Sequence, residues 1–346
     1  MDPGPLPESL SALLFPWYSA NARDLPWRRD PEPYHVWLSE IMLQQTRVEA
    51  VKGYYTRFLA AVPDIAALAE ADPDLLHKLW EGLGYYARVR NLQAAARQIM
   101  ADHRGVFPRD YDAVRKLKGI GDYTAGAICS ICFDLPTPAV DGNVLRVLSR
   151  LRKDPRCVDE ASVKQAIRRE LEKVYPTVGA GTMTQALIEL GATVCLPNGA
   201  PHCEACPLSG LCLACREGCQ ASYPVRAEKK RRKTEQLTVF VLNCGDVYAL
   251  RKRPAAGLLA ALWEFPNVPG HLEAQEALDQ AAAWGARPTG IEKRVHRTHI
   301  FTHVQWDMRC YYLTCAERPD CFTWADAEAL REAYALPTAF RMFRED

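Results

Sequence analysis

The spacing of apolar residues predicts helices over almost all of residues 36–192. Within this stretch, apolar side chains recur every three or four residues, which is the period of one helix face. The clearest series is Trp37, Ile41, Val48, Val51, Tyr55 and Phe58. A second series at Val144, Val147, Leu148 and Leu151 predicts a helix that begins just after Asp141. We therefore expect a mainly α-helical region.

The pattern changes after residue 219. Residues 237–242 form a β-like apolar run, residues 243–246 form a turn, and residues 247–250 are typical of a returning strand. The later segments are a helical, alanine-rich stretch at 272–284 and strand-like runs at 301–306 and 309–314. These patterns predict a second, α+β domain.

The chain has 346 residues, 48% of them hydrophobic, which is enough for two or three domains. We expect a helical region over 1–225, a basic linker over 226–236 and the α+β domain over 237–346. The net charge of +1 excludes a surface that is strongly basic throughout, so a nucleic-acid interface must carry local positive charge. The basic run 229–233 fits a solvated linker equally well.

The sequence gives no sign of export or of a membrane span. It has no run of about 18 apolar residues, and residues 1–5 do not resemble a signal peptide. We therefore expect a cytoplasmic protein with no membrane partner, nucleoid-associated if the cell is bacterial. A reducing compartment argues against disulfides among the 13 cysteines.

Two acids, Glu40 and Asp141, lie in settings that suit cleavage of a glycosidic bond. Glu40 adjoins the apolar stripe of its predicted helix, where burial would raise its pKa. Asp141 precedes a helix, whose N-terminus favours the charged carboxylate. A protonated acid beside an ionised one is what this cleavage requires. Taken singly, Glu40 also fits a solvated helix residue and Asp141 an ordinary N-cap.

A Gly-x-Gly turn lies between the two acids, at Gly119 and Gly121, and apolar helical segments flank it. The backbone N–H groups of such a turn can hold a phosphate. Sugar-bond chemistry beside a phosphate site suggests an enzyme that acts on nucleic acid.

Four cysteines, Cys195, Cys203, Cys206 and Cys212, fall within 18 residues. This spacing indicates a structural tetrathiolate metal site. Both an iron–sulfur cluster and zinc are compatible, since Cys215 completes a second Cys-x-x-Cys pair. Zinc ribbons usually separate their pairs by about 15–20 residues, so the spacing favours the cluster.

Together these motifs resemble the helix-hairpin-helix DNA glycosylases, and the whole chain resembles the adenine DNA glycosylases of the MutY type. The motifs that carry the resemblance are residues 25–28, 40–48, 80–88, 117–126, 140–146 and 301–303, with the four cysteines. The resemblance implies a six-helix barrel joined to a helical domain with a 4Fe-4S cluster, and a Nudix-like C-terminal domain.

The resemblance also implies a role for each matching residue. Glu40 would protonate adenine at N7, Asp141 would stabilise or capture the oxocarbenium ion, and Tyr123 and Asn143 would support Asp141. The four cysteines would hold the cluster. Residues that match the adenine pocket or the groups that fill and wedge the duplex are Trp27, Arg28, Leu43, Gln45, Thr46, Leu83, Tyr85, Gln185 and Ile188. Phe301, Thr302 and His303 match the segment that reads 8-oxoguanine.

Tyr123 separates two kinds of relative. In endonuclease III-like enzymes this position holds the lysine that attacks C1′, and a phenol cannot form that Schiff base. Two departures from the family pattern are Thr302, where serine is usual, and the seven residues between Cys195 and Cys203, where six are usual.

We therefore expect a monomeric, monofunctional glycosylase of base excision repair that removes adenine from A:8-oxoG and A:G pairs in double-stranded DNA. The alternatives are an endonuclease III-like glycosylase with lyase activity and a non-catalytic binder of mispaired DNA. A Nudix hydrolase is disfavoured, because the second domain lacks an Arg-Glu-x-x-Glu-Glu helix.

Overall fold

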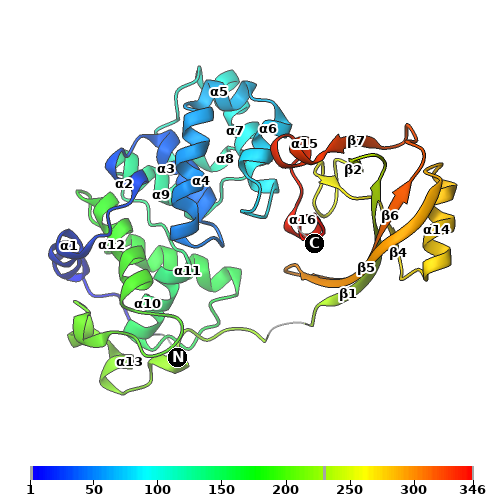
Figure 1. Ribbon diagram of the computed structural model, residues 1–346. Coiled ribbons are helices and arrows are strands. Elements are labelled where there is room, and N and C mark those ends of the chain that lie inside the picture. The colour runs from blue at the N-terminus through cyan, green and yellow to red at the C-terminus, as the bar shows by residue number, and fades with distance from the viewer. Residues whose placement is uncertain (1–2, 229–230, 345–346) are drawn as a thin grey trace. The chain divides into compact units, whose positions relative to one another are not determined.

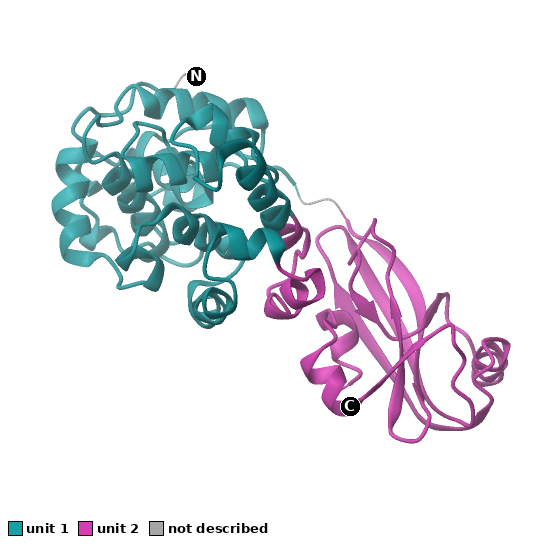
Figure 2. Cartoon of the chain, turned by 90° about the horizontal axis from the view of Figure 1, so that it is seen from above, with its two compact units in different colours: residues 1–70, 91–228 teal, residues 71–90, 229–346 magenta. Residues whose placement is uncertain are grey.

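The computed structural model describes residues 3–228 and 231–344, which form two compact units (Figure 2). Unit 1 comprises residues 1–70 and 91–228, and unit 2 comprises residues 71–90 and 229–346. Residues 71–90, which the apolar spacing assigns to the helical region, thus group with the C-terminal residues. The three predicted domain ranges, 1–225, 226–236 and 237–346, stay a prediction.

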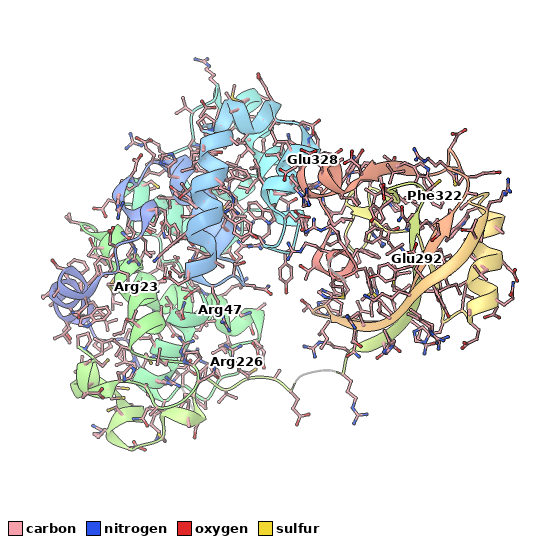
Figure 3. All side chains as sticks on the ribbon, viewed as in Figure 1. Arg23, Arg47, Arg226, Glu292, Phe322 and Glu328 are labelled. Carbon is pink, nitrogen blue, oxygen red and sulfur yellow. The ribbon has the colours of Figure 1, made fainter. Side chains whose placement is uncertain are left out.

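Only part of the predicted linker, residues 226–236, is a connection without regular structure. Arg226, which is labelled in Figure 3, belongs to unit 1 and donates to Asp159 of the same unit at 3.2 Å. Lys229 and Lys230 lie outside the described residues. Strand β1 already begins at Lys233, inside the expected linker.

Unit 1 is helical, as the apolar spacing predicted (Figure 1). Its helices are α1 (Leu10–Asn21), α2 (Pro26–Arg29), α3 (Pro33–Leu43), α4 (Val48–Ala61), α5 (Ile65–Glu70), most of α7 (Ala87–His103), α8 (Tyr111–Lys116), α9 (Asp122–Phe133), α10 (Gly142–Arg152), α11 (Ala161–Glu172), α12 (Ala180–Thr193) and α13 (Leu213–Arg216). Short 3₁₀ turns occur at Cys203–Ala205, Ser209–Leu211 and Gln220–Ser222. None of the helices described in the chain is long and apolar enough to cross a bilayer.

One hydrophobic core of unit 1 lies among α1, α10, α11 and α12, whose apolar side chains are buried together. Helices α10 and α12 approach closely at Gly191, where an added Cβ would lie 2.4 Å from the Cβ of Asn143. Glycine is therefore required at residue 191. This contact fixes the N-terminal turn of α10, which carries Asp141.

The turn between α8 and α9 also depends on a glycine. Gly119 has φ +77°, and an added Cβ would lie 2.6 Å from the Cβ of Asn91. Any larger residue would be strained in its backbone and would clash with α7. The turn leads directly into α9, whose first turn presents Tyr123.

Unit 2 is an α+β fold, as predicted. It contains α6 (Pro73–Leu79), the first residues of α7, and strands β1 (Lys233–Asn243), β2 (Val247–Lys252), β3 (Trp263–Glu264), β4 (Asn267–Pro269), β5 (Pro288–Ile300), β6 (Val304–Cys315) and β7 (Thr323–Asp326). Its other helices are α14 (Ala274–Ala283), α15 (Ala327–Glu332) and α16 (Thr338–Arg341). The strand order is β3-β2-β1-β6-β5, with β1 and β6 parallel.

Alternate residues of β1 and β6 are buried on opposite faces of this sheet. Val239 and Met308 pack with side chains of α15 and α16, whereas Phe240 and Tyr311 pack with Ala277 of α14. Burial on both faces explains why 237–242 has a continuous apolar run.

Most of the predicted elements of unit 2 are confirmed, with one wrong strand and one missed strand. Residues 301–306 do not form a separate strand, because residues 301–303 are a turn and β6 runs unbroken from Val304 to Cys315. Strand β5 was missed because most of its side chains are exposed, which leaves no apolar alternation.

Candidate active site

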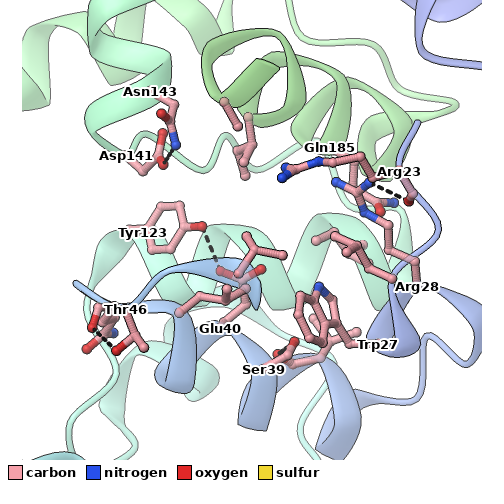
Figure 4. Close-up of a pocket in the computed structure, with 18 of the residues that line it drawn as sticks. Arg23, Trp27, Arg28, Ser39, Glu40, Thr46, Tyr123, Asp141, Asn143 and Gln185 are labelled. Atoms are coloured by element: carbon pink, nitrogen blue, oxygen red, sulfur yellow. Dashed lines mark hydrogen bonds between the residues drawn. The ribbon is translucent and has the colours of Figure 1, made fainter. Parts of the chain in front are cut away.

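A cavity of about 530 Å³ in unit 1 gathers most of the residues predicted for catalysis and base binding (Figure 4). Segments far apart in the sequence contribute to it, from α2, α3, α9, α10 and α12. The predicted residues among its lining are Trp27, Arg28, Glu40, Leu43, Gln45, Thr46, Tyr123, Asp141, Asn143, Gln185 and Ile188.

Glu40 lies on α3 and is only 8% exposed. Its Oε2 accepts a hydrogen bond of 2.6 Å from the Tyr123 hydroxyl (Figure 4). Burial raises the pKa of Glu40 to about 7, although the bond from Tyr123 acts in the opposite direction. The expectation of a raised pKa is confirmed, and near neutral pH this carboxyl can carry a proton.

Asp141 is the N-cap of α10. Its Oδ1 accepts from the Val144 N–H at 2.8 Å, and its Oδ2 accepts from Asn143 Nδ2 at 2.7 Å (Figure 4). We expected the helix N-terminus to favour the charged form, but burial raises the pKa of Asp141 and outweighs these hydrogen bonds. The expected direction was therefore wrong.

Arg146 supports this arrangement from the next turn of α10, a role that we did not predict. Its Nη2 donates to Asn143 Oδ1 at 2.9 Å and to the Gly191 carbonyl at 2.8 Å, and its Nε donates to the Cys195 carbonyl at 2.7 Å. Asn143 is thereby oriented so that its amide nitrogen faces Asp141. The same guanidinium contacts the start of the cysteine loop.

Glu189 is a second residue that the sequence reasoning missed. It is fully buried on α12 and accepts from Arg23 Nε and Arg28 Nη2, each at 2.7 Å. Burial alone would raise the pKa of Glu189, but the hydrogen bonds from Arg23 and Arg28 lower it to about 2. In the sequence, Glu189 could have been found as the single acid within the largely apolar segment 180–194. Glu189 holds Arg28 at the cavity wall.

The remaining wall of the cavity combines apolar surface with one amide. Trp27 is 6% exposed and packs edge-on against Tyr55, with ring centroids 5.5 Å apart. The Gln185 Oε1 accepts from the Tyr18 hydroxyl at 3.0 Å, which fixes the orientation of the amide. Such a wall can enclose a flat heteroaromatic ring and donate a hydrogen bond to it.

Gln45, at the edge of the cavity, has φ +60°, which is uncommon for a residue other than glycine. It directly follows α3 and the turn residue Gln44. Strained backbone of this kind is concentrated at functional sites.

A neighbouring concavity of about 450 Å³ is lined by Gly119 and Gly121 together with Lys164 and Arg168 of α11. The basic side chains add positive charge to the backbone N–H groups of the turn. Phosphate binding at Gly119 and Gly121 stays a prediction, and this local charge suits it.

The cysteine loop brings Cys195, Cys203, Cys206 and Cys212 to one cavity, which Cys215 also lines. Cys195 Sγ accepts from Arg150 Nη1 at 3.3 Å. Burial and a hydrogen bond with Cys215 raise the pKa of the Cys203 thiol. The described cysteines are all free thiols. A convergent set of reduced thiols with N–H donors beside it fits a tetrathiolate metal cluster.

The other predicted DNA-contacting residues belong to unit 2. Leu83 is buried, and Tyr85 is 49% exposed with φ +48°. The Tyr85 hydroxyl is hydrogen-bonded to Thr302 Oγ1 at 2.8 Å. Phe301 packs against Trp306 with ring centroids 4.8 Å apart, and Thr302 and His303 are exposed in the turn between β5 and β6. One surface therefore carries Tyr85 and the 301–303 segment.

Comparison with known proteins extends these observations. Residues 38–177 match the HhH-GPD superfamily of base excision DNA repair proteins, and residues 238–345 match the NUDIX domain. Adenine DNA glycosylases of Homo sapiens and Mus musculus are 34% and 33% identical to the chain over 96% of its length, and the matches cover 72% and 77% of those proteins. The chain belongs to the adenine DNA glycosylase family.

A further relative and two solved structures are also similar to the chain. The adenine DNA glycosylase of Buchnera aphidicola subsp. Schizaphis graminum is 32% identical over 85% of this chain and 83% of its own length. A thermostable thymine-DNA glycosylase has 25% identity and a TM-score of 0.55 over 61% of this chain and 96% of its own. An endonuclease III in a non-covalent DNA complex shares the fold, at 22% identity and TM-score 0.52 over 62% of this chain and 98% of its own. The family member described here is thus a DNA N-glycosylase of base excision repair with a C-terminal Nudix-like domain.

Proposed function

We propose that this glycosylase hydrolyses the N-glycosidic bond of adenine paired with 8-oxoguanine, or with guanine, and leaves an abasic site. The observation that carries the proposal is the pairing of a buried, protonatable Glu40 with Asp141 in one cavity. An enzyme that attacks C1′ must extrude the nucleotide from the duplex. The cavity of about 530 Å³ is within the range of small-molecule pockets and is large enough for a base with its sugar.

Glu40 acts as the general acid. Its raised pKa keeps a large fraction of the carboxyl protonated at neutral pH, so it can donate to N7 of the flipped adenine. Protonation makes adenine a neutral leaving group. The Tyr123 hydroxyl holds Glu40 Oε2 and so fixes the direction in which the carboxyl faces the base.

Asp141 stabilises the positive charge that develops on the sugar, or captures it covalently. The Val144 N–H and the Asn143 amide stabilise its charged form. Because Arg146 orients Asn143, we regard Asn143 and Arg146 as positioning residues for Asp141.

Tyr123 supports a monofunctional hydrolase. It stands where endonuclease III-like relatives carry the attacking lysine, and its phenol cannot form a Schiff base. Its hydroxyl is engaged with Glu40. The enzyme is expected to release adenine without breaking the DNA strand and to act as a monomer in the cytoplasm.

Adenine binding would fall to Trp27, Arg28, Leu43, Gln185 and Ile188. The apolar and aromatic wall would stack on or enclose the ring, and the fixed Gln185 amide would present its N–H₂ group toward the base edge. Gln45, Thr46, Leu83 and Tyr85 would fill or wedge the duplex where the nucleotide leaves.

The cysteine loop would hold a 4Fe-4S cluster through Cys195, Cys203, Cys206 and Cys212. When bound, the cluster would act as a structural cross-link for a segment that has only short helical turns of its own. Arg150 contributes an N–H donor to the Cys195 sulfur, and Arg146 ties the same loop to Asn143. Two arginines of α10, Arg146 and Arg150, thus bind the cysteine loop to the helix that carries Asp141 at its N-terminus.

Lesion recognition would fall to Phe301, Thr302 and His303. The hydrogen bond between Tyr85 and Thr302 supports a joint role, since it links a proposed wedge residue to the proposed lesion reader.

Truncation of the chain near Arg226 is a poor test of lesion recognition by residues 301–303. It would remove the partners of residues 71–90, among them Leu336, whose N–H donates to Glu81 at 2.9 Å. Point substitutions are cleaner.

The test uses a duplex with one A:8-oxoG pair, incubated with and without subsequent alkali, and a C:8-oxoG duplex as control. Adenine release with strand cleavage only after alkali is the expected result. Cleavage without alkali, at the rate of base release, would instead identify a lyase. Tight binding with no free adenine would identify a non-catalytic binder.

A further inference from the structure

Unit 2 contains a cluster of ligand-type side chains that the glycosylase chemistry does not use. His271 lies between β4 and α14, His296 lies on β5 and Asp307 lies on β6 (Figure 1). One donor atom from each falls within 4.8 Å of the others. The three residues come from separate segments of the chain, so the fold brings them together.

The sheet register explains why they meet. In the antiparallel pair of β5 and β6, Thr298 is opposite Asp307 and His296 is opposite Arg309. His296 and Asp307 are therefore diagonal neighbours on one face. Nε2 of His296 contacts Asp307 Oδ1, and Nε2 of His271 lies 3.7 Å from Asp307 Oδ2 and 3.0 Å from the Asp307 carbonyl.

Both histidines thus place Nε2 beside Asp307: His296 contacts the carboxylate, and His271 lies nearer the main-chain carbonyl than the carboxylate. Without an ion, the carboxylate is the partner of His296 and the main-chain carbonyl is the partner of His271. A divalent cation would engage all three side chains together, because it accepts two imidazole nitrogens and one carboxylate oxygen at once.

The distances suit such an ion. Zinc bonds of about 2.0–2.1 Å in a tetrahedron place ligand atoms about 3.3 Å apart. The present separations are within 4.8 Å, so small side-chain rotations would close the site. Nitrogen donors favour zinc over magnesium or calcium, which prefer oxygen.

The surrounding charges are compatible with a cation. Arg309 lies nearby on β6, but it donates to Glu273 at 2.6 Å, and Arg294 lies 3.9 Å from the same carboxylate. Glu273 therefore offsets one of the two guanidinium charges, and the closer contact is with Arg309. His296 is 61% exposed, so an ion and water can reach the cluster from solvent.

We propose that His271, His296 and Asp307 form a zinc site. The ion would join the segment before α14 to the β5–β6 hairpin, whose turn carries residues 301–303. Its role is structural, and it holds the half of the hairpin next to the turn that presents the proposed lesion reader. The proposal does not depend on which base pair the enzyme recognises.

The test is zinc binding by the intact, iron-loaded protein, measured by equilibrium dialysis against zinc chloride and elemental analysis. We expect one zinc per chain in addition to the iron. His271→Ala and Asp307→Asn should each weaken binding at least about tenfold. His299→Ala is the matched control, since it removes a histidine from β5 that is outside the cluster, and it should bind zinc as the unaltered protein does.

Hydrogen exchange provides a second measurement that does not depend on the variants folding normally. Zinc should slow exchange of the amides of residues 304–307 in the unaltered protein. Full zinc binding by the double variant His271→Ala/His296→Ala would place the ion elsewhere, for example at the cysteines, and overturn the proposal. Failure of the unaltered protein to bind zinc stoichiometrically would overturn it as well.

Discussion

Replacing Tyr123 by Phe should move the alkaline limit of catalysis to higher pH. Burial raises the pKa of Glu40 to about 7, and the hydrogen bond from the Tyr123 hydroxyl limits that rise. Without the hydroxyl, the charged carboxylate loses a partner and the pKa of Glu40 rises further. A hydrogen bond to a charged group contributes about 1.5–3 kcal/mol, and about 1.36 kcal/mol corresponds to one pH unit. The pH at which the rate falls to half on the alkaline side should therefore move upward by about one to two pH units.

The rate should fall at alkaline pH because Glu40 acts as an acid. The rate of the chemical step depends on the protonated fraction, so it should fall about tenfold per pH unit above the midpoint. In the unaltered protein that midpoint lies near pH 7. At low pH the rate should fall as Asp141 becomes protonated, and burial raises the pKa of Asp141 above its ordinary 3.8. The profile is thus bell-shaped.

The assay is single-turnover release of adenine from a mispaired duplex, followed from about pH 5 to about pH 9. The Tyr123→Phe variant should lose activity near pH 7 if positioning of Glu40 matters, yet retain a larger share of its own maximum at high pH. Glu40→Gln is the control. It should bind the duplex, lose about 10²–10⁴-fold in rate and show no alkaline limb. An unchanged midpoint in Tyr123→Phe, or a Glu40→Gln rate within threefold of the unaltered enzyme, would refute the reasoning.

Four further outcomes are expected. Because the folded-state pKa of Glu40, about 7, exceeds its ordinary 4.5, its ionisation opposes folding as pH rises between these values. Glu40→Gln should therefore stabilise the protein at pH 8 by up to about 3 kcal/mol, with little gain near pH 4.5, and equal gains in melting temperature at both pH values would contradict this. Asp141→Asn should abolish the chemical step while duplex affinity holds or rises, whereas loss of binding alone would make Asp141 only a helix cap. Protein purified without oxygen should contain about four irons per chain. Cys212→Ser should lower the iron content, and Cys215→Ser should leave it unchanged. Stoichiometric zinc in place of iron would exclude the cluster. His303→Ala should reduce the preference for A:8-oxoG over A:G by about 1–2 kcal/mol, measured as the ratio of adenine-release rates, and an unchanged ratio would exclude His303 as a lesion reader.

Local signals predicted much of the fold and some of the site. The apolar period located α3 and α10, and the N-cap position of Asp141 followed from the start of the second series. The turn at residues 243–246 and the helix near 272–284 were also found. Each of these features depends on residues within a few positions of one another, so a short window of sequence contains the necessary information.

Features that depend on burial were harder to predict. Strand β5 is mostly exposed and carries many charged residues, so it has no apolar pattern, although it pairs with β6 over its whole length. The pKa of Asp141 was assigned the wrong direction, because a helix N-terminus can be read from the sequence but the desolvation that outweighs it cannot.

The sequence by itself determined which chemistry was available: two acids, a glycine turn before Tyr123, and closely spaced cysteines. Only the tertiary structure decided how these groups meet. Tyr123 reaches Glu40 across 83 positions, and Arg23 and Arg28 reach Glu189 across more than 160. Such pairs form because helices pack in one particular arrangement, and the free energy of that packing is spread over the whole core. No local pattern of residues encodes it.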